Sequence, residues 1–155
     1  MSLQFSQLAP ARAYANLHQL REKAVCYVTW GAKLLVFDHV PDDSGVQVAA
    51  GGVEIGETPA QAASREVAEE TGQLGFGAPS YLGSAVWINL EHAKREMRHF
   101  FHLTAPPELP ETWDCLADEH LFRFRWAALN NPQLDWDFDT FLSKLKSPVH
   151  TGATP

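Results

Sequence analysis

The sequence has few features that would indicate a disulfide framework, a zinc site or a membrane anchor. Its two cysteines, Cys26 and Cys115, match no metal-ligand spacing, and its seven histidines include no H-x-x-x-H pair. We therefore expect reduced thiols. No apolar run approaches the roughly 20 residues that span a bilayer, and the first residues lack the basic start and apolar core of a signal peptide. These absences predict a cytoplasmic protein without a membrane segment.

Positive charge is also scarce. Twelve Lys and Arg residues face 19 Asp and Glu residues, a net charge of −7, and no basic run stands out. We expect no nonspecific binding to nucleic acid, and an anionic ligand must be attracted by metal ions or by a few local cations. The length and the 45% apolar content suit a single domain over residues 1–155. We place its core at about 22–146 and expect a flexible tail over 147–155. Monomer and homodimer both remain open.

Negative charge is concentrated in one segment, where five glutamates lie within 17 positions. Thr58 is suited to cap a helix and Pro59 to begin it, and Gly72 is suited to end it in a left-handed conformation. On a helix over 59–70, Glu66 and the neighbouring pair Glu69–Glu70 place three carboxylates on one face. Like charges at this spacing cost a few tenths of a kcal/mol per pair, and acids near a helix C-terminus oppose the helix dipole.

These unfavourable terms indicate a function that outweighs them. Mg²⁺ or Mn²⁺ fits, because hard divalent cations take carboxylate oxygens, water and phosphate oxygens. Glu57, in the turn before the helix, is placed to close toward the cluster, and Arg65 to hold one carboxylate in position. A helix of this composition is ordinarily a solvated, salt-bridged surface. The preceding turn Gly51-Gly52-Val53-Glu54-Ile55-Gly56-Glu57 favours a site instead, because a surface helix does not need it.

The same residues resemble a known family. The segment Gly51-x5-Glu57-x7-Arg65-Glu66-Val67-x-Glu69-Glu70-x-Gly72 resembles the Nudix box, written G-x5-E-x7-R-E-U-x-E-E-x-G-U with U apolar. Every specified position matches except the last, where Gln73 replaces an apolar residue. Ala50 stands where many members have a proline. Neither departure touches a charged position, and the box covers about a seventh of the chain.

The resemblance implies an α/β/α sandwich with a mixed central sheet. It also implies Mg²⁺-dependent hydrolysis, with Mn²⁺ as an alternative ion, of a nucleoside diphosphate linked to another group. Glu66, Glu69 and Glu70 match the family's metal-binding glutamates, and Glu57 matches a supporting ligand.

By the same comparison Arg65 matches the arginine that orients a glutamate, and Gly51 matches the glycine that opens the loop beside the metal. A metal-activated water would attack phosphorus after a carboxylate removes its proton. That base is either a box glutamate or an acid further along the chain. Our candidate for the distal acid is Glu119, just before a strand with alternating aromatic residues; a solvated loop acid is the equally weighted alternative.

The non-phosphate part of a substrate requires other residues. Arg98 is a candidate for phosphate contact, and Trp87 and Trp113 are candidates for stacking on a base. An aromatic residue on a strand is more often part of the core. Trp113, in a proline-rich loop, is the aromatic residue least expected there.

The hydrophobic pattern predicts a mixed sheet covered by helices. Besides the helix over 59–70, we expect helices over 7–22 and 138–146, strands over 24–30, 33–39, 46–50, 84–89, 96–104 and 123–128, and loops over 75–79 and 106–119.

Three functions fit these observations. The first is a metal-dependent pyrophosphohydrolase acting on a nucleoside triphosphate or related nucleotide. The second is a catalytically silent nucleotide sensor, which the full set of box glutamates disfavours. The third is an isomerase of an isoprenoid diphosphate, which would require a reactive cysteine; neither Cys26 nor Cys115 has a recognisable context for one.

Overall fold

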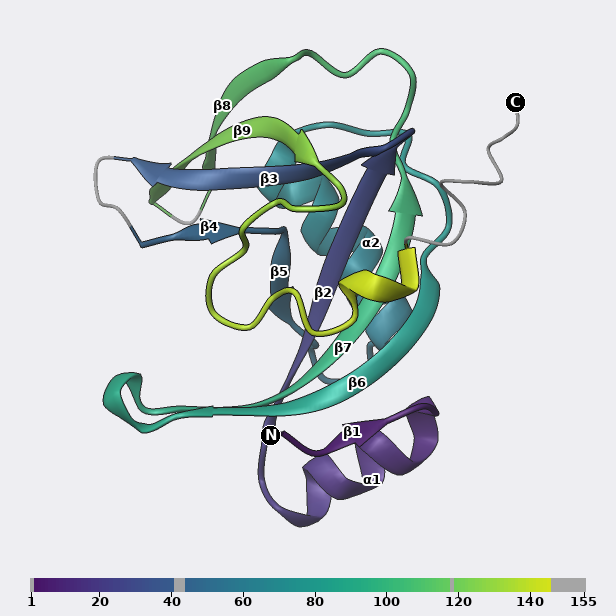
Figure 1. The fold of residues 1–155 in the computed structure, drawn as a ribbon. Coiled ribbons are helices and arrows are strands. Elements are labelled where there is room, and N and C mark those ends of the chain that lie inside the picture. The colour runs from purple at the N-terminus through teal and green to yellow at the C-terminus, as the bar shows by residue number, and fades with distance from the viewer. Residues whose placement is uncertain (1, 41–43, 118, 146–155) are drawn as a thin grey trace.

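The fold is a mixed β-sheet with two α-helices, seen in a computed structural model that describes residues 2–40, 44–117 and 119–145 (Figure 1). The helices are α1 (Leu8–Leu17) and α2 (Pro59–Thr71), with short 3₁₀ helices η1 (Leu90–His92) and η2 (Leu142–Leu145). The strands are β1 (Gln4–Phe5), β2 (Arg21–Trp30), β3 (Lys33–Val40), β4 (Val46–Gln47), β5 (Ala50–Gly52), β6 (Ser80–Asn89), β7 (Lys94–Thr104), β8 (Thr112–Ala117) and β9 (His120–Ala128).

The sheet order is β1-β6-β7-β2-β3-β9-β8. β2 and β7 are parallel, and the other neighbouring pairs are antiparallel. β2 follows β7 over Arg21–Thr29 but pairs with β3 only at Thr29 and Trp30. The two strands therefore diverge, as Figure 1 shows, and β3 continues along β9. β5 pairs with β2 where β3 has turned away, at Lys23, Ala24 and Val25.

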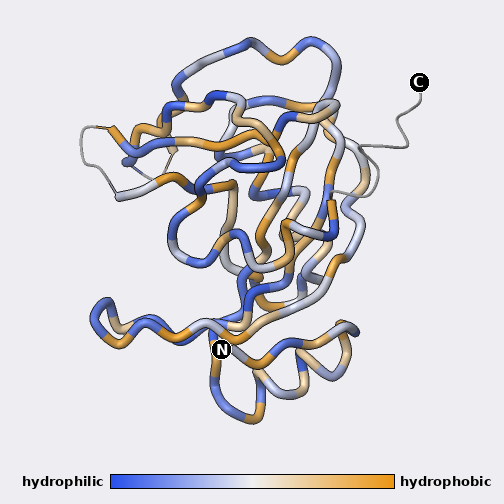
Figure 2. Tube along the Cα trace, viewed as in Figure 1, coloured by the Kyte–Doolittle hydropathy of each residue, from blue (hydrophilic) through white to orange (hydrophobic). Residues whose placement is uncertain are grey.

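Each face of the sheet has its own apolar cluster. Ala24, Cys26 and Val28 of β2 pack toward α2, whereas Val25 and Tyr27 pack toward the C-terminal segment that contains η2. This period of two is the signature of a strand buried on both sides. Figure 2 shows the apolar residues concentrated on these central strands. The predicted fold class, α/β with a mixed central sheet, is confirmed.

α2 is the element that the sequence specified best. The hydroxyl of Thr58 accepts from the Gln61 N–H at 3.1 Å, and the Gln61 side chain accepts from the Thr58 N–H at 2.9 Å. This reciprocal capping box satisfies two donors that a helix leaves unpaired. Gly72 ends the helix with φ of 69°, a conformation that glycine adopts without strain. The predicted start and end of this helix are confirmed.

An N-terminal arm, residues 2–17, packs beside β6 and β7. The helix predicted over 7–22 is shorter than expected, because the chain enters β2 at Arg21. Ala11 and Ala15 of α1 pack against Met97. Arg12 donates to Glu22 at 2.9 Å, and Glu22 lies 2.8 Å from Nε2 of the buried His99. The arm is thus fixed to the sheet by both apolar and charged contacts.

Two predictions in the C-terminal third are wrong. The loop expected over 106–119 contains β8, whose Trp113, Cys115 and Ala117 pack toward α2. The helix expected over 138–146 is only the short η2, and residue 146 lies outside the described part. Tyr27 explains this difference, because its hydroxyl donates to the carbonyl of Phe138 and accepts from the N–H of Phe141. A buried side chain thus takes backbone groups that a helix would pair internally.

The remaining predicted strands largely match those of the structure. The strands expected over 24–30, 33–39 and 123–128 correspond to β2, β3 and β9, and the expected hairpin is formed by β6 and β7. The strand expected over 46–50 is divided into β4 and β5. Cys26 is buried, Cys115 is partly buried, and neither forms a disulfide in this structure.

Candidate active site

Arg65 of α2 forms hydrogen bonds with several glutamates of the box. Its guanidinium donates to both Glu57 oxygens at 2.7 and 2.9 Å, to Glu66 at 2.7 Å and to the carbonyl of Gly52 at 2.9 Å. Glu69 is more distant, with an Oε1 at 3.4 Å from Nη1. The hydrogen bonds from Arg65 lower the pKa of Glu57 to about 2. Glu57 is therefore ionised at neutral pH, and Arg65 fixes it relative to the helix.

Glu66 and Glu70 form the least exposed part of the cluster, with Glu70 buried and Glu66 half-buried. Burial and, to a smaller extent, the Glu66 carboxylate together raise the pKa of Glu70 to about 8, against the hydrogen bond from the Ala50 N–H. Burial also raises the pKa of Glu66. The Ala50 N–H lies 3.1 Å from Glu70 Oε1, so β5 anchors this side chain. Both pKa values are raised because two carboxylates lie together away from water. A bound cation would offset the cost of ionising them.

The glycine pair of β5 makes the close approach possible. A Cβ at Gly51 would lie 1.9 Å from the Glu66 carboxyl carbon, and a Cβ at Gly52 would lie 2.7 Å from Arg21 Nη2. Only glycine leaves room for Glu66 against the strand. Opposite sides of β5 therefore face opposite charges, Glu66 on one side and Arg21 on the other.

The acids fit a hard cation by their chemistry, although Arg65 links them in this structure. Among residues 2–40, 44–117 and 119–145, no three His, Cys, Asp or Glu side chains lie close enough together to hold a metal ion. Glu66 and Glu70 supply carboxylate oxygens at one place, and Glu69 is exposed on the same helix face. Oxygen donors of this kind are those that Mg²⁺ and Mn²⁺ prefer.

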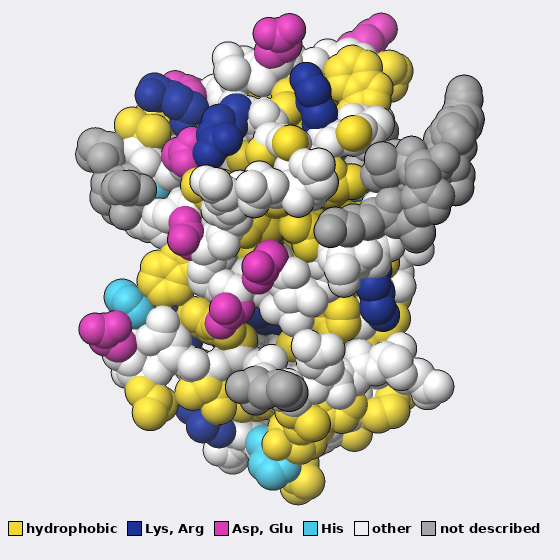
Figure 3. Space-filling model, in the orientation of Figure 1, with side chains coloured by type: hydrophobic (Ala, Val, Ile, Leu, Met, Phe, Trp, Pro, Cys, Tyr) yellow, Lys and Arg dark blue, Asp and Glu magenta, His cyan; other side chains and the backbone are white. Residues whose placement is uncertain are grey.

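Glu119 lies in the tight turn between β8 and β9, with φ of 65°. In the part of the chain that the structure describes, no hydrogen bond or ion pair joins it to the box glutamates. The structure therefore leaves the distal acid as a hypothesis. The neighbouring strands carry paired charges, Arg123 with Asp114 and Arg125 with Asp38, and Figure 3 shows basic and acidic side chains side by side over this region.

A cavity of about 260 Å³ lies on the sheet face that carries Val25 and Tyr27. We call it the cationic pocket. It is lined by Lys23, His39, Gln47, Trp87, His92, Lys94, Glu96, Arg98, Trp136 and Phe138. Two of the three residues predicted for substrate binding, Trp87 and Arg98, meet here. Three Lys and Arg side chains face one carboxylate, in a protein whose net charge is −7.

Arg98 is the central residue of the cationic pocket. Its Cζ lies 3.8 Å from the centre of the Trp87 ring and 4.3 Å from that of Phe138. Its Nε donates to Glu96 at 2.9 Å, and its Nη1 donates to the carbonyl of Trp136. Both Arg98 and Glu96 are almost fully buried. This is a guanidinium held between two aromatic rings and tied to a carboxylate.

Sequence reasoning missed Lys23, Glu96 and Trp136 as pocket residues. They lie on three separate elements, and no spacing within the sequence links them. One backbone feature marks this pocket in the structure, although the sequence does not reveal it. Trp136 and Asp137 are consecutive residues with φ of 60° and 61°. Left-handed backbone at a bulky residue is costly and tends to occur where the structure has a reason to hold it.

Trp113 has a structural position instead. Its ring stacks on Phe124 at 5.1 Å, and its indole N–H donates to the carbonyl of Thr71 at 2.8 Å. It packs against the core cluster beneath α2. The expectation that Trp113 lies outside the core is therefore wrong, because β8 replaces the expected loop.

A family model described as "NUDIX domain" matches residues 20–145. A Nudix hydrolase from Nitrosomonas europaea aligns with a TM-score of 0.59 and 21% identity, over 86% of this chain and 84% of that chain. A MutT Nudix hydrolase from Burkholderia pseudomallei aligns with a TM-score of 0.66 and 19% identity, over 83% and 99%.

The dihydroneopterin triphosphate pyrophosphohydrolase of E. coli aligns with a TM-score of 0.57 and 21% identity, over 81% of this chain and 96% of that chain. At these identities the similarity shows a shared fold. No curated protein matches the chain. Within the described residues, neither α-helix has the length and apolar content to span a bilayer.

Proposed function

The chain belongs to the Nudix hydrolase family, and we propose that it hydrolyses a phosphoanhydride bond in a nucleoside diphosphate linked to another group, using Mg²⁺ or Mn²⁺. The observation that carries this proposal is the adjacent pair of the half-buried Glu66 and the buried Glu70, of which Glu66 lies where only a glycine at position 51 leaves room. Protein carboxylates are rarely buried together unless a proton or a cation neutralises them.

Glu66, Glu69 and Glu70 would hold the metal, with Glu57 in support. A bound Mg²⁺ supplies charge neutralisation at the phosphates and lowers the pKa of a coordinated water. Arg65 orients Glu57 and Glu66 through its fork of donors. The Ala50 N–H fixes the carboxylate of Glu70.

The proton of the attacking water requires a carboxylate base. Glu70 and its neighbours in the box are one source, and Glu119 on the β8–β9 turn is the other. Glu70 packs against β5 and is only 9% exposed, so its carboxylate is largely shielded from bulk water.

The cationic pocket is suited to the nucleotide-like part of the substrate. Trp87 and Trp136 offer aromatic surface, and Lys23, Lys94 and Arg98 attract negative charge. Ligand sites are commonly concave and mostly apolar, with a few convergent polar groups. The overall field repels anions, so the local cations provide the attraction.

A phosphate-release screen over nucleoside triphosphates, dinucleotides and nucleotide sugars, with Mg²⁺ and with Mn²⁺, tests the proposal. We expect turnover of at least one compound, and a loss of at least about 10²-fold in Glu69→Gln and in Glu70→Gln, because a metal ligand or base is removed. Glu91→Gln, an exposed acid on η1, is the matched control and should retain wild-type rates.

The outcomes separate the alternatives. Wild-type protein that turns over no compound, yet binds nucleotides, would be a silent sensor. Near-normal rates in Glu70→Gln would show that the ligands are assigned wrongly. Glu119→Gln identifies the base: a loss as large as that of Glu70→Gln places it on the β8–β9 turn, and an unchanged rate places it within the box.

A further inference from the structure

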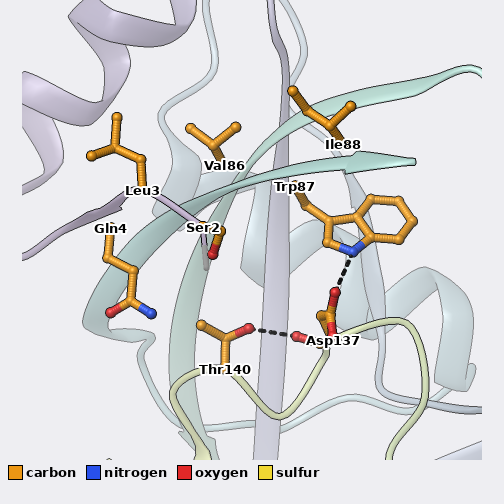
Figure 4. Close-up of a pocket in the computed structure, with 8 residues that line it drawn as sticks. All are labelled: Ser2, Leu3, Gln4, Val86, Trp87, Ile88, Asp137 and Thr140. Carbon is orange, nitrogen blue, oxygen red and sulfur yellow. Dashed lines mark hydrogen bonds between the residues drawn. The ribbon is translucent and has the colours of Figure 1, made fainter. Parts of the chain in front are cut away.

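A second cavity, of about 650 Å³, adjoins the cationic pocket and is walled by the N-terminal arm (Figure 4). We call it the arm pocket. It is lined by Ser2, Leu3, Gln4, Val86, Trp87, Ile88, Asp137 and Thr140. Its volume lies within the range of small-molecule sites. Residues 2–4 precede the 20–145 segment that matches the family model.

The arm pocket exists because β1 covers only part of β6. Gln4 and Phe5 pair with Ala85 and Ser84, and the Val86 N–H donates to the carbonyl of Leu3. Beyond this point β6 continues to Asn89. The arm is fixed to the rest of the protein by the contacts of α1 with β7 and by the Arg12–Glu22 ion pair.

The chemistry of the arm pocket is opposite to that of the cationic pocket. Among the residues that the structure describes, no Lys, Arg or His lines it, and Asp137 is its one charged side chain. Asp137 Oδ2 accepts from the Trp87 indole N–H at 2.9 Å, as Figure 4 shows. Its Oδ1 has no hydrogen bond within the described residues. Leu3 and Ile88, each about half exposed, supply apolar surface. A phosphate is repelled here, whereas a neutral group with hydroxyl donors and an apolar face is complementary.

Trp87 joins the two pockets. Arg98, in the cationic pocket, lies 3.8 Å from the centre of its indole ring, while its indole N–H points to Asp137 in the arm pocket. A ligand that lies along Trp87 would therefore meet cations at one end and a carboxylate at the other. If the nucleoside of a nucleoside triphosphate occupies the cationic pocket, the molecule has no second neutral group that could occupy the arm pocket.

We propose that the arm pocket binds a neutral, hydroxyl-bearing group of the substrate, so that the enzyme favours nucleotide sugars over nucleoside triphosphates. This inference rests on the proposed function and names its substrate class. Asp137 accepts a hydroxyl of the sugar, and Leu3, Val86 and Ile88 cover its apolar face. The N-terminal arm thus determines specificity without contributing to the acid cluster.

Ile88→Trp tests the proposal by filling the arm pocket without adding charge. Leu17→Trp is the matched control, because Leu17 is exposed on the same arm and lines neither pocket. The measured quantity is the ratio of kcat/KM for UDP-glucose, GDP-mannose and ADP-ribose to that for UTP, GTP and ATP. We expect at least one ratio to fall about tenfold or more in Ile88→Trp, on the scale of lost pocket contacts, and none to change in Leu17→Trp. Unchanged ratios in Ile88→Trp would overturn the proposal.

Binding to the metal-free protein separates this proposal from the proposed function. Calorimetry compares each nucleotide sugar with its nucleoside diphosphate, and it requires no turnover. Tighter binding of a sugar conjugate by the wild type, lost in Ile88→Trp, supports the arm pocket even if no compound is hydrolysed. Equal affinity for conjugate and diphosphate in the wild type would overturn it, even if hydrolysis is observed.

Discussion

Arg65 and Arg98 organise two charged regions of the molecule by opposite means. Arg65 is partly exposed and binds carboxylates from α2 and from the turn before it. Arg98 is buried, lies between two aromatic rings and binds one carboxylate two residues away on β7. The first region concentrates negative charge and the second positive charge.

The comparison shows two ways in which a chain holds charge inside a fold. The acids around Arg65 are reached by solvent or by a cation, so their mutual repulsion is relieved from outside the protein. The buried charges of Arg98 and Glu96 are instead stabilised within the protein, by each other and by the aromatic rings beside Arg98. Loss of an acid should therefore damage function in the first region, whereas loss of Arg98 or Glu96 alone should also damage stability in the second.

The largest expected effect on stability is that of Arg98→Met. It leaves Glu96 as a buried carboxylate whose remaining ion-pair partner among the described residues is Lys23, at 3.7 Å. We expect a loss of about 3–5 kcal/mol in the free energy of unfolding, measured by urea denaturation. Arg65→Met should cost less, because Glu57 and Glu69 can turn to water.

A double variant sharpens this test. Arg98→Met with Glu96→Leu removes both buried charges and should recover part of the lost stability. If the double variant is no more stable than Arg98→Met, the cost comes from the lost packing on Trp87 and Phe138 instead.

A smaller effect concerns pH. The folded-state pKa of Glu70, about 8, is above its ordinary value of 4.5. Its contribution to stability is therefore complete below about pH 4.5 and is lost as the pH rises through about 8. In EDTA, the wild type should lose more than about 1 kcal/mol relative to Glu70→Gln between pH 5 and 8. Unfolding curves at several pH values measure this difference, and parallel curves would contradict it.

Adding Mg²⁺ at pH 8 extends the same experiment. The cation stabilises the ionised carboxylates, so the wild type should gain stability that Glu70→Gln gains to a lesser extent. Equal gains would mean that Mg²⁺ binds elsewhere on the protein.

The smallest effect distinguishes the two tryptophans proposed from sequence. Trp113→Phe removes the hydrogen bond to Thr71 and should cost about 1 kcal/mol without changing KM. Trp87→Phe removes the bond to Asp137 and the larger ring over Arg98, and should raise KM. A KM change in Trp113→Phe alone would reverse these assignments.

The sequence predicts the acid region well because its signals are local. Thr58, Pro59 and Gly72 delimit α2, and the fixed spacing of the glutamates places them on one face. The cationic pocket has no such signal, since Lys23, Glu96 and Trp136 come from strands and a loop that only the tertiary fold brings together. The same reason applies to the end of the chain, where Tyr27, more than 100 residues away, takes the hydrogen bonds of the expected helix.

The two glycines of β5 affect how strongly the charges on either side of this strand interact. A single strand without Cβ atoms at Gly51 and Gly52 stands between Glu66 and Arg21. Peptide screens charge less than water does. Neutralising Glu66 on one side of the strand should therefore alter the electrostatic potential at Arg21 on the other.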